Sequence, residues 1–271
     1  MKNLKLLRCV FLFMMIFNIE SIFSQSINDK AFLLCKYTET SIPDSNNRQQ
    51  FNYDVMGLEI GKKVSRFYSI SNDETIKKIE EQAKQTGSID FRNLSTPKNK
   101  RGKERVIFKN YTSKQLISTE NLGMFSYTVQ EPIPVIDWKI QSDTIHILNY
   151  SCQKATCQFR GRNYEVWFTP EINVSEGPWK FTGLPGLILK VTESKGHFIL
   201  ECKGVEKVNF DLEILDGKGQ KVTREEFLKA NKLFLEDPMP FMNNGRSSFT
   251  PDSLPASLRK RPYNPMELTE K

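Results

Sequence analysis

Two histidines are the side chains in this sequence that are best suited to acid or base chemistry near neutral pH. His146 lies between Ile145 and Ile147, as a strand residue would, and His197 follows a glycine that is typical of a turn. Neither belongs to a Gly-x-Ser-x-Gly nucleophile motif or to a His-Glu-x-x-His zinc motif. We therefore interpret both as surface or satisfied structural residues, predict no catalytic residue and expect that the chain is not an enzyme.

Four cysteines beyond the N-terminal region could form disulfides or bind a metal: Cys35, Cys152, Cys157 and Cys202. An even number fits disulfide pairing in an oxidising compartment, and three pairings are open. A local bridge between Cys152 and Cys157 requires a bend, because an odd separation on a straight strand puts the two side chains on opposite faces. Neither histidine lies beside a cysteine at zinc-ligand spacing. We predict disulfides or buried free thiols, and no metal.

Charged residues also lack a pattern that indicates chemistry. Carboxylates are plentiful in the predicted strands, but no spacing marks a catalytic pair among Asp137, Asp143, Glu165 and Glu171. One basic run could attract nucleic acid or anionic lipid, and consists of Lys98, Lys100, Arg101, Lys103 and Arg105. Because no aromatic residues interleave to stack on bases, we interpret this run as a solvated loop. We predict no cofactor and no nucleic-acid partner.

The N-terminal region has the layout of a secretory signal peptide. Three basic residues precede an apolar run over residues 10–17, and Ser24 followed by Gln25 offers a small residue at the cleavage site. Asn18 and Glu20 interrupt the run after about 8 to 10 residues, whereas a membrane span needs roughly 20. Cleavage after residue 24 removes three basic residues and one acidic residue, so the formal net charge falls from +7 to +5. We expect an exported chain in the periplasm or cell exterior, with at most peripheral membrane contact.

The densest pattern runs from Gly177 to Leu189 and includes Gly-Leu-Pro-Gly-Leu-Ile. Pro185 presets φ at the second position of a turn and Gly186 accepts positive φ at the third, which predicts a type II turn over residues 184–187. The twist of this turn suits a corner before a strand better than a hairpin. A phosphate-binding loop would require a Lys-Ser/Thr pair opening a helix, and an apolar strand follows instead. We interpret ten residues as structural, with ligand binding as the alternative: Gly177, Pro178, Trp179, Phe181, Gly183, Leu184, Pro185, Gly186, Leu187 and Ile188.

This segment resembles the signature that names the GLPGLI family. The resemblance extends to residues 44–45, 56–69, 150–167 and 264–268, although Asn173 replaces a usual proline and Cys157 looks particular to this chain. Proteins of that family are secreted or periplasmic products of Gram-negative bacteria without an assigned activity. Members are often encoded near outer-membrane receptors. The resemblance therefore implies an accessory role in the cell envelope.

Apolar and aromatic runs predict mostly strands. They cover residues 31–40, 55–60, 64–70, 105–111, 115–118, 124–130, 137–150, 150–160, 163–169, 187–191 and 196–205. Turn residues at 61–62, 161–162 and 193–195 predict three hairpins. Helices are expected over residues 74–85 and from Thr223 to about Leu235, the second opened by a capping box with Glu226. Six of the thirteen prolines lie beyond residue 237, so we expect an extended or irregular tail.

These elements predict a mainly β fold: a single large antiparallel twisted sheet, with curling into a half-barrel left open, and two short helices. The expected organisation is a signal peptide over residues 1–24, a β domain over residues 25–236 and a proline-rich tail over residues 237–271. We expect an accessory or binding protein for an apolar ligand, in a pocket lined by Trp167, Trp179 and Phe181, or for an outer-membrane partner. The alternatives are a structural partner of an outer-membrane receptor without a ligand, and a hydrolase.

Overall fold

A computed structural model describes residues 29–86, 105–212, 219–243 and 264–269. The predicted signal peptide, four of the five residues of the basic run and most of the proline-rich tail lie outside these ranges. Within them, the strands are β1 (Lys30–Ser41), β2 (Asn52–Ile60), β3 (Val64–Ser69), β4 (Val106–Asn110), β5 (Gln115–Leu122), β6 (Phe125–Pro132), β7 (Lys139–Ile147), β8 (Tyr150–Phe159), β9 (Arg162–Thr169), β10 (Leu187–Glu193), β11 (Phe198–Asp211) and β12 (Gln220–Val222). The helices are α2 (Ile70–Thr86), α3 (Arg224–Glu236) and α4 (Met239–Met242).

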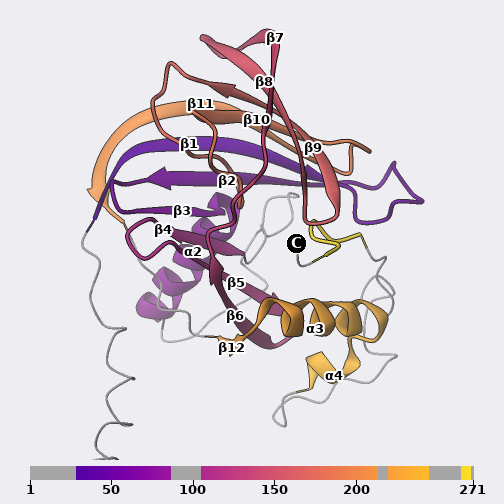
Figure 1. Ribbon diagram of the computed structural model, residues 1–271. Helices are drawn as coiled ribbons and strands as arrows, with labels where there is room; N and C mark the ends of the chain where they lie inside the picture. Colours follow the sequence, from indigo (N-terminus) through magenta and orange to yellow (C-terminus); the bar gives the residue numbers. More distant parts are fainter. Residues whose placement is uncertain (1–28, 87–104, 213–218, 244–263, 270–271) are drawn as a thin grey trace, which may run out of the picture.

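All twelve described strands belong to one sheet in the order β12-β6-β5-β4-β3-β2-β1-β11-β10-β9-β8-β7 (Figure 1). Neighbours pair antiparallel, except that the short β12 runs parallel to β6, so the sheet is mixed. The sheet is open, with β12 and β7 at its two edges. The prediction of one large, mainly antiparallel sheet is therefore confirmed.

Short connections set the register of the hairpins, as the turn residues predict. Between β8 and β9, Arg160 and Gly161 have φ values of 52° and 77°. Positive φ at both central residues is the type I′ geometry, whose twist matches that of the flanking strands. The predicted turn was one residue too late, because Arg162 already pairs with Phe159 as the first residue of β9.

Both predicted helices are present. At the start of α3, the Thr223 side chain accepts a hydrogen bond from the Glu226 backbone and the Glu226 carboxylate accepts one from the Thr223 backbone, which confirms the capping box. Phe227 and Phe234 then pack on β6 in a small cluster of their own. The prediction of an irregular tail is wrong for α4, where Pro240 falls in the first turn and removes an N–H that has no partner within the helix.

The main core contains residues from strands across the sheet and from the segment that carries the Gly-Leu-Pro-Gly motif. It contains Leu58 from β2 and Ala155 from β8, together with Trp179 and Phe181 from that segment. Because successive strand residues point to opposite faces, Arg66 of β3 lies on the face opposite this core. Its ion pair with Asp73, at 2.9 Å, places α2 on that second face. Figure 1 shows α3 beside β6 and β12.

Among the described residues, none of the helices combines the length and the apolar character that crossing a lipid bilayer requires.

Candidate functional site

The motif forms a corner that leads into β10, as predicted, but the turn type differs. The Gly186 N–H donates to the Leu184 carbonyl at 2.8 Å across Pro185, which is a three-residue γ-turn, and φ of Gly186 is 158°. The predicted type II turn is therefore wrong. Glycine is required for another reason: a Cβ at position 186 would lie 2.2 Å from the Thr169 carbonyl oxygen. The backbone of the corner passes too close to the end of β9 for any side chain.

Lys109 of β4 binds residues 176–181, the segment that precedes the corner. Its Nζ donates to the Glu176 carboxylate at 3.0 and 3.1 Å and to the carbonyls of Gly177 and Phe181, both at 3.0 Å. The side chain is fully buried, and this desolvation lowers the pKa of Lys109, although the charge of Glu176 opposes the shift. The buried ammonium thus binds the loop that carries Trp179. Sequence analysis could not predict this pair, because the two residues are 67 positions apart in the chain.

The predicted aromatic pocket is not formed by the three residues named for it. Trp179 is 2% exposed and Phe181 is 0% exposed, and their rings meet edge to face with centroids 5.1 Å apart. Trp167, in register with Lys154 and Lys190, is partly buried and packs against the main core. The expectation is wrong because Trp179 and Phe181 fill the space between the halves of the sheet rather than line a cavity.

The four cysteines are free thiols in the structure, and all are buried. Burial raises the pKa of Cys152 and Cys202 to about 11 and that of Cys157 to about 12. The pKa of Cys35 also rises well above its ordinary value, mainly because of burial. Such thiols stay protonated at neutral pH and are poor nucleophiles. Of the two predicted alternatives, the structure shows buried thiols rather than disulfides.

His146 and Cys152 do not form the thiol and base pair that a hydrolase could use. His146 is exposed on β7 and pairs with Ser151 of β8. Cys152, the residue after Ser151, is buried. Successive residues of a strand point to opposite faces of the sheet. The structure does not bring these two side chains together.

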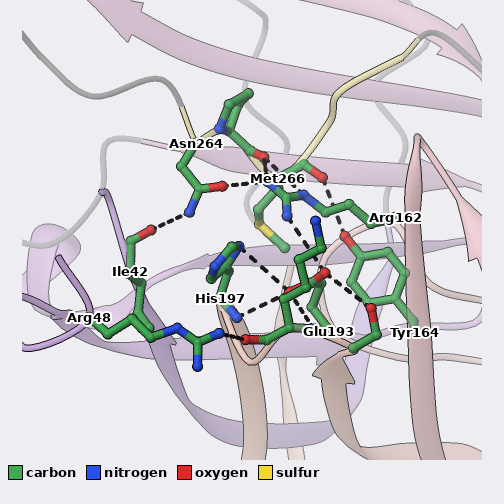
Figure 2. Close-up of polar contacts among 11 residues, drawn as sticks. Ile42, Arg48, Arg162, Tyr164, Glu193, His197, Asn264 and Met266 are labelled. Carbon is green, nitrogen blue, oxygen red and sulfur yellow. Dashed lines mark hydrogen bonds and ion pairs between the residues drawn. The ribbon is translucent and has the colours of Figure 1, made fainter. Parts of the chain in front are cut away.

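His197, between β10 and β11, is 6% exposed and lies beside Glu193 (Figure 2). Its backbone N–H donates to a Glu193 carboxylate oxygen at 3.1 Å, and its Nδ1 lies 3.9 Å from the same oxygen. Burial lowers the pKa of His197; Glu193 opposes this shift, and Arg162 and Arg48 reinforce it. The imidazole is therefore neutral at pH 7 and packed in a polar group, but among the described residues its buried Nδ1 has no hydrogen-bond partner, so the expectation of a surface or satisfied histidine is not met.

The same polar group holds the C-terminal segment, which we define as residues 264–269. Arg162 donates to the Pro265 carbonyl from Nε at 3.1 Å and to the Asn264 side-chain oxygen at 2.7 Å. Asn264 in turn donates to the Ile42 carbonyl at 2.6 Å. Figure 2 shows these contacts linking the segment to β9 and to the residue that follows β1. Residues far apart in sequence thus meet around one guanidinium group.

The next residue of the segment, Met266, is inserted into the main core and is 7% exposed. The Tyr164 hydroxyl donates to its carbonyl at 3.3 Å, and Arg105 lies 3.4 Å from its sulfur. Arg105 also forms a buried ion pair with Glu39 at 2.8 Å. The interpretation of the basic run as a solvated loop is therefore wrong for Arg105, because Glu39 on the long first strand compensates its charge.

Glu267, whose side chain is 13% exposed, joins four buried charged side chains in a group that we call the charged cluster: Glu131, Arg160, Lys180, Arg224 and Glu267. Lys180 lies 2.5 Å from Glu131 and 2.8 Å from Glu267, Arg160 lies 2.6 Å from Glu131, and Arg224 pairs with Glu267. Burial alone would raise the pKa of Glu267, but Lys180 and Arg224 outweigh it and leave the pKa below its usual value. The cluster joins β6, the turn before β9, the motif segment, α3 and the C-terminal segment.

An open aromatic pocket of about 150 Å³ lies where β6, β12 and α4 meet, and is lined by Phe125, Tyr127, Gln220, Pro240 and Phe241. The Met124 N–H donates to the Phe241 carbonyl at 2.9 Å, which holds α4 against the turn between β5 and β6. Gly123 permits this approach, since a Cβ there would lie 2.3 Å from the same carbonyl oxygen. Sequence analysis missed this pocket because its aromatic residues come from two segments over 100 residues apart.

Within the described part of the chain, no group of three or more His, Cys, Asp or Glu side chains could hold a metal ion. The carboxylates of the charged cluster and of the Lys109 pair are compensated by cations in contact with them. Such groups can fix loops and exclude water.

Comparison with solved structures found similarity to PNGF-II at low sequence identity. Two structures of PNGF-II, in the P21 and C2 space groups, resemble it with 18% and 16% sequence identity over 73% and 76% of this chain, each with a TM-score of 0.46. The chain spans about a third of the length of PNGF-II, 33% in both cases. No curated protein matches the chain.

A family model matches more than half of the chain, over residues 62–226, and is described as the N-terminal domain of the N-glycanase peptide. This family differs from the GLPGLI family that the motif resembles, and membership of the latter stays a prediction. The chain belongs to the N-glycanase peptide, N-terminal domain family.

Proposed function

We propose that this chain is an exported, non-catalytic module that binds N-linked glycans in support of an N-glycanase. The observation that carries the proposal is the aromatic pocket beside α4, whose lining residues include Phe125, Tyr127 and Phe241 together with Gln220. The family match supports the glycan class, since its description names an N-glycanase. An accessory role also agrees with the structural contacts of the motif segment and the charged cluster, whose charged groups pair with one another and hold loops in place.

Sugar recognition suits the chemistry of this pocket. The face of an aromatic ring carries negative charge from its quadrupole, and the C–H bonds of a pyranose ring are weakly positive, so the two stack. Gln220 is exposed and offers both a donor and an acceptor to sugar hydroxyl groups. A few polar groups among aromatic walls are typical of small-molecule sites. A single sugar unit at the end of a glycan is the class of ligand that we expect.

Titration of a panel of free N-glycans by isothermal calorimetry tests the proposal. We expect saturable binding by the wild-type protein, and a loss of about tenfold in affinity for Phe125→Ala, which corresponds to the value of one aromatic contact. Phe51→Ala is the matched control, because Phe51 is 58% exposed and is not among the residues lining the pocket. It should leave the affinity unchanged.

Catalysis is tested separately with a glycoprotein substrate, by measuring glycan release. No release is expected from the purified chain alone. Release that survives purification and disappears in the Phe125→Ala variant would show an enzyme and overturn the non-catalytic part of the proposal. No binding to any glycan of the panel would overturn the glycan part.

A further inference from the structure

The C-terminal segment occupies a groove whose walls are formed by elements that pair without it. Arg162 and Tyr164 belong to β9, which lies between β8 and β10 in the sheet. Ile42 follows β1, and its N–H donates to the His197 carbonyl at 2.9 Å. Residues 264–269 themselves adopt no helix or strand. The groove is thus built by the sheet together with Lys180 of the motif segment and Arg224 of α3, and the segment lies in it as a peptide would.

Residues 264 to 267 all contact the groove, and Figure 2 shows the contacts of Asn264 with Arg162 and Ile42. The Asn264 amide bridges Arg162 and the Ile42 carbonyl, and Arg162 also binds the Pro265 carbonyl, at 2.5 Å from its second terminal nitrogen. Met266 enters the core, and Glu267 contacts two cations. One residue later, the Leu268 N–H donates to the Arg160 carbonyl at 2.9 Å. Peptide-binding proteins recognise extended peptides through such contacts with successive residues.

Charge explains why the groove selects a carboxylate. The charged cluster has three cations, Arg160, Lys180 and Arg224, and Glu131 is its one carboxylate from outside the C-terminal segment. All four side chains are no more than 9% exposed. Without Glu267 two buried positive charges would lack compensation, and buried charges are strongly destabilising unless they are paired. An acidic side chain in this position restores the balance.

We infer that this groove is a peptide-binding site for segments of the form Asn-Pro-Met-Glu, filled in the structure by the chain's own C-terminal segment, which a second copy of this chain can replace. Arg160, Arg162, Lys180 and Arg224 determine the specificity of the site. Twenty residues of sequence separate Asn243 from Asn264. Because the segment belongs to the same chain as the groove, it competes for the groove within one molecule, which favours it over the segment of a second copy. Exchange between copies is correspondingly weak until the tether is cut.

The experiment uses the full chain with a protease site inserted between Asn243 and Asn264. After cleavage, the C-terminal peptide should co-elute with the folded body, and an excess of a labelled peptide of residues 262–271 should replace it. A peptide with Glu267→Gln should bind about tenfold more weakly, the value of one charge-assisted hydrogen bond. A Leu268→Ala peptide is the matched control, because this side chain is 44% exposed; its affinity should be unchanged. The uncut chain should take up far less label.

Three results would overturn the inference. The cleaved body could unfold, which would show that the segment is an inseparable part of the core. The labelled peptide could fail to exchange with the cleaved one, or the Glu267→Gln peptide could bind as well as the wild-type peptide. None of these results depends on glycan binding, so this inference and the proposed function can fail independently.

Discussion

Replacing Lys109 by methionine keeps most of the side-chain volume but removes the buried ammonium group. The Glu176 carboxylate, with its side chain 3% exposed, then lacks its ion-pair partner, and the carbonyls of Gly177 and Phe181 lose a donor. Breaking a buried pair from one side typically costs about 3–5 kcal/mol, because the remaining charge stays desolvated. We expect Lys109→Met to lower the free energy of unfolding by about 4 kcal/mol.

Urea denaturation followed by circular dichroism and Trp fluorescence measures this loss as a shift of the midpoint at constant slope. Adding Glu176→Gln to Lys109→Met should recover a large part of it, since a neutral amide tolerates burial better than a carboxylate. Lys36→Met is the matched control: Lys36 also pairs with a glutamate, Glu206, at 2.8 Å, but both side chains are exposed. That pair should be worth no more than about 1 kcal/mol.

The reasoning would be refuted if Lys109→Met cost no more than Lys36→Met. It would also be refuted if the double variant were as unstable as the sum of the two single variants, because the two residues would then not be coupled.

Two further outcomes follow from the structure. Gly186→Ala should destabilise the fold by about 3 kcal/mol, since its Cβ would overlap the Thr169 backbone. Gly204→Ala is the control and should be neutral, because a Cβ at position 204 would meet nothing within 4 Å. Equal thermal midpoints for the two variants would contradict the argument that the backbone passes too close at position 186. The pKa of His197 is lowered in the folded chain, so the folded state binds fewer protons than the unfolded state, and stability should fall as the pH drops below about 6.5. His197→Gln should flatten the dependence of the free energy of unfolding on pH between about pH 5 and 7. The lowered pKa of Glu267 affects stability only at lower pH. An unchanged pH dependence in the variant would count against this role of His197.

Much of the fold could be predicted because its signals are local. Runs of apolar and aromatic residues predicted eleven of the twelve described strands but not β12, and turn residues predicted three hairpins with an error of one residue at Arg160. The capping box at Thr223 located the start of α3 because both partners lie within one helical turn. The helix α4 was missed, since a proline that breaks a helix interior is tolerated in a first turn and the two cases look alike in sequence.

The candidate sites were less predictable because they depend on contacts across the sheet. Trp179 and Phe181 were identified as important, but their type alone does not distinguish a pocket lining from a packed core. Arg105 belonged to a basic run in sequence, yet its charge is compensated by Glu39, 66 residues away. The aromatic pocket depends likewise on α4 folding back toward the turn at Gly123.

The sequence by itself determined the mainly β character, the hairpins, the corner at Pro185 and the absence of a recognisable catalytic motif, because these follow from neighbouring residues and backbone preferences. The tertiary structure alone decided which buried charges are paired, which aromatic rings stay accessible and where residues 264–269 bind. The physical reason is that burial and electrostatic compensation depend on the distance between side chains in space, which a long mixed sheet sets through its strand order.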